Sequence, residues 1–276
     1  MPTSALSFLY LYILNCSTWN KKSNVLVPRG TFAVLDPSTS PGGGVYPEPA
    51  ERAQDDTRNL IMSYKTNIEQ QNLLNQFLQE HGVKLSEETL GKLYDYADLV
   101  VETKQFGNLI SAKDSEKFLS RHIADSLVPY IYIVKEKQMA PGKKWADMGA
   151  GAGCPVFPLA IVMPEVEFFA VEPRNMRVQF MNFVKEKLQL SNMTVVGKRF
   201  ETSGLSNLDF ISCRALSTFE NDWERAMPGL KKGGMFLTLK SFNNIVHLEN
   251  DPAVHIYKYA LPQEEQSYAL VTRGNE

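Results

Sequence analysis

The chain has 276 residues, of which 43% are hydrophobic and 22% charged, and its formal net charge at pH 7 is −2. This composition is typical of a globular protein with a sizeable core and excludes a disordered chain. The balanced charge excludes a global basic field, so a nucleic-acid partner would have to be bound by a local basic patch.

Cysteine and histidine are few and scattered. The three cysteines, Cys16, Cys154 and Cys213, lie far apart without metal-ligand spacing, and the chain has only four histidines. We therefore expect neither a metal site nor a disulfide framework. This usage favours a reducing compartment, and we expect a cytoplasmic protein.

The first 61 residues differ in composition from the rest. Residues 4–14 are apolar, but no Lys or Arg precedes them and the run is too short to span a bilayer, so a membrane role is only the minor alternative. Residues 36–56 are rich in Pro, Gly, Ser and acids, a composition that buries too little apolar surface to fold. We expect 1–61 to be largely unstructured and dispensable, an extraneous extension or the result of a misassigned start before Met62.

Helical periodicity from Tyr64 onward indicates three helices, which together form a helical lobe over 62–138. Gly82 is typical of the position after a helix, and Ser86 is a good N-cap for the second helix. The apolar stripes consist of Leu73, Leu74, Phe77 and Leu78, then Leu90, Leu93, Tyr94, Ala97 and Val100 or Val101, and finally Phe118, Leu119, Ile123 and Leu127.

Strands alternate with helices after Lys144, and this alternation is typical of an α/β fold with a doubly wound, mostly parallel sheet over 139–276. The last two strands alternate with period two, so we expect an antiparallel pair at the sheet edge. The expected strands are 144–148, 166–172, 193–197, 208–213, 235–240, 255–261 and 266–273, with helices at 155–163, 174–189 and 217–229.

Three glycines alternate in the turn after the first of these strands, at Gly149, Gly151 and Gly153, and Asp147 precedes them. Glycines at the carboxyl end of a parallel strand allow a sharp turn and a close approach to a ligand. A dinucleotide fingerprint would have its third glycine one position later, where Cys154 stands. A turn that is merely tight is the alternative.

The pattern Asp-x-Gly-x-Gly-x-Gly resembles motif I of the class I S-adenosylmethionine-dependent methyltransferases. In that family the glycines accommodate the methionine portion of the cofactor, and the first acid, here Asp147, lies near its ammonium group. An acid at the end of the second strand accepts the ribose hydroxyls, and Glu172 has that place here. The resemblance implies a Rossmann-like, seven-stranded sheet in which the turn at 149–153 faces Glu172.

Further motifs narrow the resemblance to the RsmG/GidB methyltransferases, which methylate N7 of a guanine in small-subunit ribosomal RNA. These motifs are NLI (108–110), RHIADS (121–126), KRFE (198–201), CRAL (213–216) and LKKGGMFLTLKS (230–241), and the resemblance covers roughly 65–276. Carried over residue by residue, it implies that the cofactor positions fall on Gly149, Cys154, Phe200, Glu201 and Arg214.

The chain departs from that family pattern at several of these places. Cys154 stands where the family usually has an aromatic or aliphatic residue, and Val156 stands where it has glycine. Glu172-Pro173 replaces Asp-Ser, and Met176 replaces a cation. A longer acid can still receive ribose hydroxyls, whereas the loss of a cation is expected to weaken contacts to RNA phosphates.

The chemistry implied by the resemblance needs no catalytic base, because N7 of guanine carries an exposed lone pair and needs only positioning. Cys213 lacks the preceding proline of the cytosine-C5 enzymes, and we interpret it as a buried strand cysteine. Arg214 stands at the carboxyl end of the same strand, where it could hold the cofactor carboxylate or position the RNA. A simple pair with a surface acid is the alternative.

Basic residues around the turn are candidates for RNA binding, namely Arg121, Arg177, Lys198 and Lys240. His122 and Asp125 share one helical face, where they either dock the lobe on the turn, shape the guanine pocket or serve packing alone.

Two other functions stay open. A small-molecule methyltransferase would share the cofactor half, and a non-catalytic interaction protein would retain only the fold. In each case we expect a monomer.

Overall fold

The computed structural model describes residues 17–20, 25–28, 63–65, 67–107, 109–136 and 141–276. The chain divides into two units, Met1–Arg58 and Asn59–Glu276. In the first unit, β1 (Ser17–Asn20) pairs antiparallel with β2 (Val25–Pro28). The expectation that 1–61 is unstructured falls mostly on residues outside the described part, and it stays a prediction.

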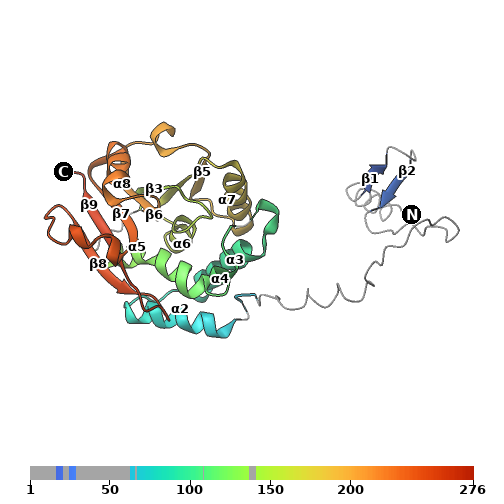
Figure 1. Cartoon of the computed structure of the whole chain (residues 1–276), viewed down its shortest axis with the longest axis horizontal. Coiled ribbons are helices and arrows are strands. Elements are labelled where there is room, and N and C mark those ends of the chain that lie inside the picture. The colour runs from blue at the N-terminus through green and yellow to red at the C-terminus, as the bar shows by residue number, and fades with distance from the viewer. Residues whose placement is uncertain (1–16, 21–24, 29–62, 66, 108, 137–140) are drawn as a thin grey trace, which may run out of the picture. The chain divides into compact units, whose positions relative to one another are not determined.

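The second unit is built on a seven-stranded sheet with the order β5-β4-β3-β6-β7-β9-β8 (Figure 1). Strands β5 to β7 in that order run parallel, and β9 and β8 are antiparallel to their neighbours. The predicted mostly parallel sheet with an antiparallel edge pair is confirmed. The strands are β3 (Lys144–Met148), β4 (Glu167–Val171), β5 (Met193–Val196), β6 (Leu208–Arg214), β7 (Leu230–Ser241), β8 (His255–Ala260) and β9 (Ser267–Gly274).

Strand β7 begins five residues earlier than the predicted 235–240, at Leu230. Its pairing with β6 is irregular, since Leu208 faces Leu230 but Phe210 faces Met235. A Cβ at Gly234 would lie 2.8 Å from the carbonyl oxygen of Leu208, so only glycine allows the two backbones to approach this closely. The sequence Lys-Lys-Gly-Gly is typical of a turn, and for that reason the predicted strand begins only after it.

The helical lobe contains α2 (Ile68–Glu80), α3 (Glu87–Glu102), α4 (Ala112–Ser115) and α5 (Ala124–Lys135). Ser86 caps α3 as predicted, because its Oγ accepts a hydrogen bond from the Thr89 amide at 3.2 Å. The predicted third helix is divided: a π-helical segment over Phe118–Ile123 leads directly into α5. Such wider turns occur often at functional sites.

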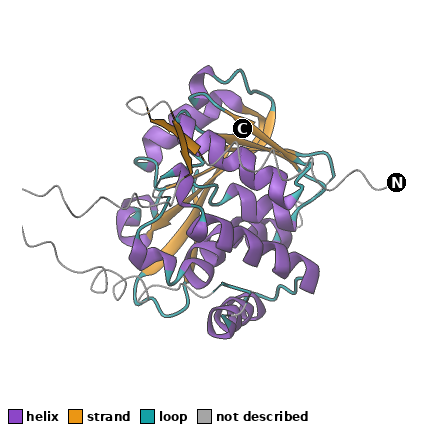
Figure 2. Ribbon diagram, turned by 90° about the vertical axis from the view of Figure 1, so that its right-hand side faces the viewer, coloured by secondary structure: helices purple, strands orange, loops and turns teal. Residues whose placement is uncertain are grey.

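Helices cover both faces of the sheet, and Figure 2 shows the strands with helices to either side. The remaining helices are α6 (Val156–Val162), α7 (Asn175–Leu188) and α8 (Phe219–Ala226). One buried apolar cluster contains Leu93 and Leu127 of the lobe together with Trp145 of β3. The next residue of β3, Ala146, belongs to a second cluster with Phe236. The lobe therefore shares its core with one face of the sheet.

The order of the sheet fixes where a ligand can bind. The chain leaves β3 toward β4 on one side, and β6 continues to β7 on the other, so the strand order reverses between β3 and β6. Open α/β sheets bind ligands at the carboxyl ends of the strands that flank such a switch point. Asp147 of β3 faces Ser212 of β6, so Gly149 and Arg214 each lie two residues beyond that pair at this edge.

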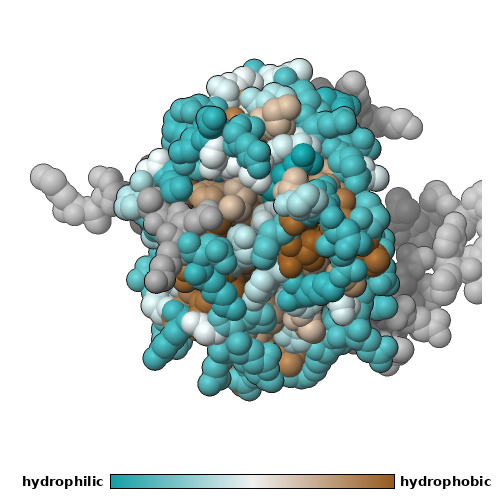
Figure 3. Space-filling model, turned by 90° about the vertical axis from the view of Figure 1, so that its left-hand side faces the viewer, coloured by the Kyte–Doolittle hydropathy of each residue, from teal (hydrophilic) through white to brown (hydrophobic). Residues whose placement is uncertain are grey.

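Figure 3 shows the face of the molecule that lies on the left in Figure 1, and its surface is mainly hydrophilic with apolar areas between the polar side chains. Within the described ranges, no helix has the length and apolar character that crossing a bilayer requires. In the same residues, no group of three or more His, Cys, Asp or Glu side chains is arranged to hold a metal ion.

Candidate active site

The glycine turn faces Glu172, as the sequence predicts. The Gly151 amide donates to Oε2 of Glu172 at 3.0 Å, and the amide and Nε of Arg174 donate to Oε1 at 3.0 and 2.9 Å. The Glu172 side chain is only 1% exposed. Burial raises the pKa of this carboxyl, but the hydrogen bonds from Arg174 and Gly151 outweigh it. Its pKa therefore lies below the usual value, and Glu172 is charged at neutral pH.

The three glycines of the turn all have positive φ, at 69°, 59° and 100° for Gly149, Gly151 and Gly153. A Cβ at Gly151 would meet nothing closer than the Gly149 carbonyl oxygen, 3.8 Å away. A Cβ at Gly153 would instead lie 2.3 Å from the ring of Phe157. At Gly151 the turn thus presents bare backbone beside a buried acid, an arrangement that fits a ligand lying directly on it.

Asp147 is the second buried acid of the site, with 1% of its surface exposed. Ser212 Oγ donates to Asp147 Oδ1 at 2.6 Å, and Trp145 Nε1 in turn donates to Ser212 Oγ at 3.0 Å. Burial raises the pKa of Asp147 to about 7, although Ser212 and the Arg214 charge act in the opposite direction. Asp147 therefore changes its charge near neutral pH.

Cys154 contacts the helical lobe. Its Sγ lies 3.3 Å from the hydroxyl of Tyr96 of α3, which also donates to the Ala152 carbonyl at 2.9 Å. The Tyr96 ring stacks on Phe157 with ring centres 5.5 Å apart. Tyr96 thus braces the glycine turn from the lobe. Sequence reasoning missed this role, because Tyr96 shows only the helical spacing of a core residue.

Phe200 and Glu201 follow the carboxyl end of β5, but their side chains turn toward α8. The Phe200 ring packs so closely on Gly229 that a Cβ there would lie 2.7 Å from it. Glu201 pairs with Arg225 of α8 at 3.4 Å. These two contacts are made with α8 and with Gly229 just after it.

Arg214 joins the sheet edge to the lobe. Its Nη1 lies 3.1 Å from His122 Nδ1 and 3.2 Å from Asp125 Oδ2. The Arg214 side chain is 22% exposed and that of Asp125 is 12% exposed, so the partner is not a surface acid. Burial lowers the pKa of Arg214, but the neighbouring Cys154 and Asp125 outweigh it and hold that pKa above its usual value. The His122–Asp125 pair thus docks the lobe on the edge of β6.

The four candidates for RNA binding differ in their surroundings. Arg121 pairs with Asp114 at 2.9 Å, and Arg177 Nη1 donates to the Leu109 carbonyl at 3.1 Å. Lys198 is exposed.

Lys240 is the exception, because its side chain is only 6% exposed and its Nζ lies 2.8 Å from Asp222 Oδ2. Lys240 also donates to the Ser217 carbonyl. Because this buried ion pair uses the ammonium group, Lys240 is placed as a structural cation, and we leave it out of the RNA contacts proposed below.

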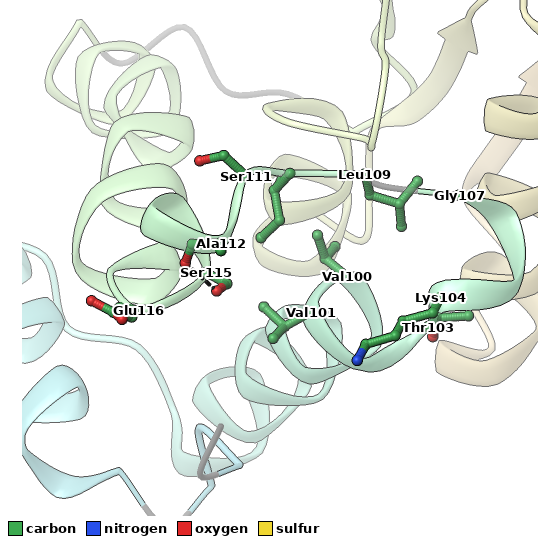
Figure 4. A pocket seen from close by; sticks show the side chains of 11 residues that line it. Val100, Val101, Thr103, Lys104, Gly107, Leu109, Ser111, Ala112, Ser115 and Glu116 are labelled. Carbon is green, nitrogen blue, oxygen red and sulfur yellow. Dashed lines mark hydrogen bonds between the residues drawn. The ribbon is translucent and has the colours of Figure 1, made fainter. Parts of the chain in front are cut away.

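A cavity of about 500 Å³ opens at the carboxyl end of β6, and we call it the Arg214 cavity. Its wall includes Arg121, His122, Asp125, Arg214, Leu216 and Tyr268. Figure 4 shows a second cavity, of about 580 Å³, where Val100 and Val101 at the end of α3 face Leu109 near the start of α4. No residue of the glycine turn lines the second cavity, so it does not belong to the same site.

The fold and the site together define a class of protein. The sheet is seven-stranded and mostly parallel, and its strand β3 ends in a glycine turn that faces a buried acid after β4. These features define a Rossmann-like S-adenosylmethionine-dependent methyltransferase.

Residues 89–269 match the family rRNA small subunit methyltransferase G (GidB), and the chain belongs to this family. The curated ribosomal RNA small subunit methyltransferase G of Staphylococcus haemolyticus is 34% identical over 176 residues, which cover 62% of this chain and 72% of the relative. That of Staphylococcus saprophyticus is 32% identical over 180 residues, which cover 64% and 74%. A solved S-adenosylmethionine-dependent O-methyltransferase of Thermotoga maritima aligns with a TM-score of 0.44 and 17% identity, over 64% of this chain and 71% of that one.

Proposed function

We propose that this chain transfers a methyl group from S-adenosylmethionine to N7 of a guanine in small-subunit ribosomal RNA. The observation that carries the proposal is the glycine turn facing the buried, charged Glu172 in a member of this family. The names of the curated relatives support the RNA substrate. The family resemblance of the RHIADS and CRAL segments supports N7 as the target.

The cofactor would be held at the carboxyl ends of β3 and β4. Among the described residues, Glu172 Oε2 accepts a hydrogen bond from the Gly151 amide alone and therefore has capacity for a ribose hydroxyl, while the backbone at Gly151 is open. We assign the buried Asp147 the role of balancing the ammonium group of the methionine portion, as the family resemblance implies. The remaining cofactor positions that we propose are Gly149, Gly153, Cys154, the main chain at Phe200 and Glu201, and Arg214.

When bound, the cofactor supplies an activated methyl group on a sulfonium sulfur, which the lone pair of N7 accepts without loss of a proton. The protein therefore has to bind, orient and exclude water rather than supply a base. For RNA binding we propose the surface cations Arg121, Arg177 and Lys198, and we propose a cytoplasmic monomer that requires no metal.

Methyl transfer to ribosomal subunits tests this function. Small subunits from cells that lack the modification are incubated with radiolabelled S-adenosylmethionine and the purified chain, and subunits from modified cells are the control. We expect label in the unmodified subunits alone, and strand cleavage at a single guanine after the treatment that breaks RNA at N7-methylguanine. Label that appears only in small molecules, or the absence of transfer, would contradict the proposal.

The raised pKa of Asp147 predicts that cofactor affinity depends on pH. Below pH 7 the carboxyl is mostly protonated in the free protein, whereas a bound ammonium group favours the charged form. Affinity should therefore rise with pH, and binding should be on the order of tenfold weaker at pH 6 than at pH 7.5. Calorimetric titration measures this change. The Asp147→Asn variant is the control and should show little pH dependence; an equal slope in both proteins would rule out Asp147 as the titrating group.

A further inference from the structure

Tyr96 reaches the glycine turn from the helical lobe with a buried hydroxyl group. It stands inside α3 and is fully buried. Its hydroxyl carries one proton and donates it to the Ala152 carbonyl at 2.9 Å. The thiol of Cys154, 3.3 Å away, therefore donates its own proton to the tyrosine oxygen. Burial raises the pKa of Tyr96 well above its usual value, so the hydroxyl keeps its proton at physiological pH.

The ring of Tyr96 is fixed by packing on two sides. It stacks on Phe157 of α6 with ring centres 5.5 Å apart, and it meets Phe118 of the π-helical segment at a steep angle with ring centres 6.1 Å apart. A Cβ at Gly153 would lie 2.3 Å from the Phe157 ring and 3.1 Å from the Tyr96 hydroxyl oxygen. The hydroxyl is therefore held against the turn by a ring that has little room to move.

The two halves of the turn are held from different parts of the protein. The Gly151 amide donates to Glu172 at 3.0 Å, so the first half is held by the residue that follows β4. The Ala152 carbonyl is held by Tyr96 instead, and the Ala152 amide has no hydrogen-bond partner among the described residues. Gly153 follows with φ at 100°, in a region that only glycine adopts easily. Ala152 is thus fixed through its carbonyl and offers its amide to a ligand.

We propose that Tyr96 is a positioning residue for the cofactor: its hydroxyl holds the part of the turn at 152–154 in the conformation that binds the methionine portion of S-adenosylmethionine. This inference rests on the proposed function, which places the cofactor on the glycine turn. A binding conformation that is only partly populated lowers the affinity by the populated fraction. Without the hydroxyl, fewer molecules have the turn in that conformation. Cofactor affinity then falls, although every backbone group of the turn is still present.

Two phenylalanine variants separate positioning from packing. Tyr96→Phe removes the hydroxyl and keeps the ring between Phe118 and Phe157. Tyr64→Phe is the matched control, because the Tyr64 hydroxyl is also buried and donates to a backbone carbonyl, that of Ser115 within the lobe. The two variants should lose a similar free energy of unfolding in urea. Only Tyr96→Phe should bind S-adenosylmethionine about tenfold more weakly by calorimetry.

The kinetics of methyl transfer give a second measure that a loss of folded protein would not produce. In Tyr96→Phe the KM for S-adenosylmethionine should rise about tenfold, while kcat at saturating cofactor stays close to that of the wild type, because bound cofactor restores the conformation of the turn. A smaller share of folded protein would lower kcat and leave KM unchanged. That second pattern would show that the hydroxyl serves stability alone and would contradict the proposal.

A smaller ligand tests which portion of the cofactor depends on Tyr96. 5′-Methylthioadenosine keeps the adenosine and lacks the amino-acid end, and its binding at millimolar concentration is observed by NMR. It should bind the wild type and Tyr96→Phe with equal affinity. A loss as large as that for S-adenosylmethionine would overturn the assignment to the methionine portion.

Two further results would overturn the inference, namely unchanged S-adenosylmethionine affinity in Tyr96→Phe, or an equal loss of affinity in Tyr64→Phe. The proposed function fails separately, because it fails only if the wild-type chain binds no S-adenosylmethionine or transfers no methyl group to small subunits.

Discussion

Replacing Gly153 with alanine should destabilise this protein by about 3–5 kcal/mol, more than any other added methyl group in the glycine turn. Gly153 has φ at 100°, a conformation that an alanine adopts only with strain. The new Cβ would also lie 2.3 Å from the Phe157 ring, which cannot withdraw because it stacks on Tyr96. Urea unfolding of the variant and the wild type measures the change in the free energy of unfolding.

Gly204 provides the matched control for this prediction. Its φ is 80°, but a Cβ there would meet nothing within 4 Å. Gly204→Ala should therefore cost only the backbone strain, about 1 kcal/mol. Similar losses in the two variants would show that the Phe157 ring yields, and that Gly153 is required only for its backbone conformation.

Local patterns were sufficient to predict most of the fold. The cap at Ser86, the strand–helix alternation and the period-two tail each depend on residues close in the sequence, and the structure has the elements they indicate. The family resemblance predicts that the glycine turn faces Glu172, and the Gly151 amide does donate to this carboxylate. Strand β7 was shortened in the prediction because the Gly233–Gly234 pair, which allows close backbone approach, is also typical of a turn.

Contacts between distant segments could not be predicted from such patterns. Tyr96 carries no sign in the sequence that it braces a turn more than fifty residues later. Lys240 is a charged residue at the end of a strand and is therefore predicted to be a surface cation, but its side chain is buried against Asp222 of α8. The partners of Arg214 likewise come from the lobe, so only the assembled fold shows that His122 and Asp125 contact it.

Loss of the charge on Glu172 should weaken cofactor binding by about tenfold or more, equivalent to roughly 1.5–3 kcal/mol, because a charged acceptor binds hydroxyl groups more strongly than a neutral amide does. Glu172→Gln is preferable to alanine, since Glu172 is buried and an amide oxygen can still accept from Gly151 or Arg174. The variant therefore changes the acceptor with the least disturbance of the turn.

Glu167 offers a matched control on the same strand. It stands at the amino end of β4, whereas Glu172 follows the carboxyl end of the same strand. Its side chain is half exposed near Lys144. Glu167→Gln removes one carboxylate charge just as Glu172→Gln does, but away from the glycine turn. It should therefore leave cofactor binding unchanged.

The most direct test of the account is a calorimetric titration of S-adenosylmethionine into three proteins at pH 7.5: the wild type, Glu172→Gln and Glu167→Gln. The account predicts one binding site with equal affinity in the wild type and Glu167→Gln, and affinity reduced about tenfold or more in Glu172→Gln. Absence of binding to the wild type, or equal affinity in all three proteins, would contradict the placement of the cofactor on the glycine turn.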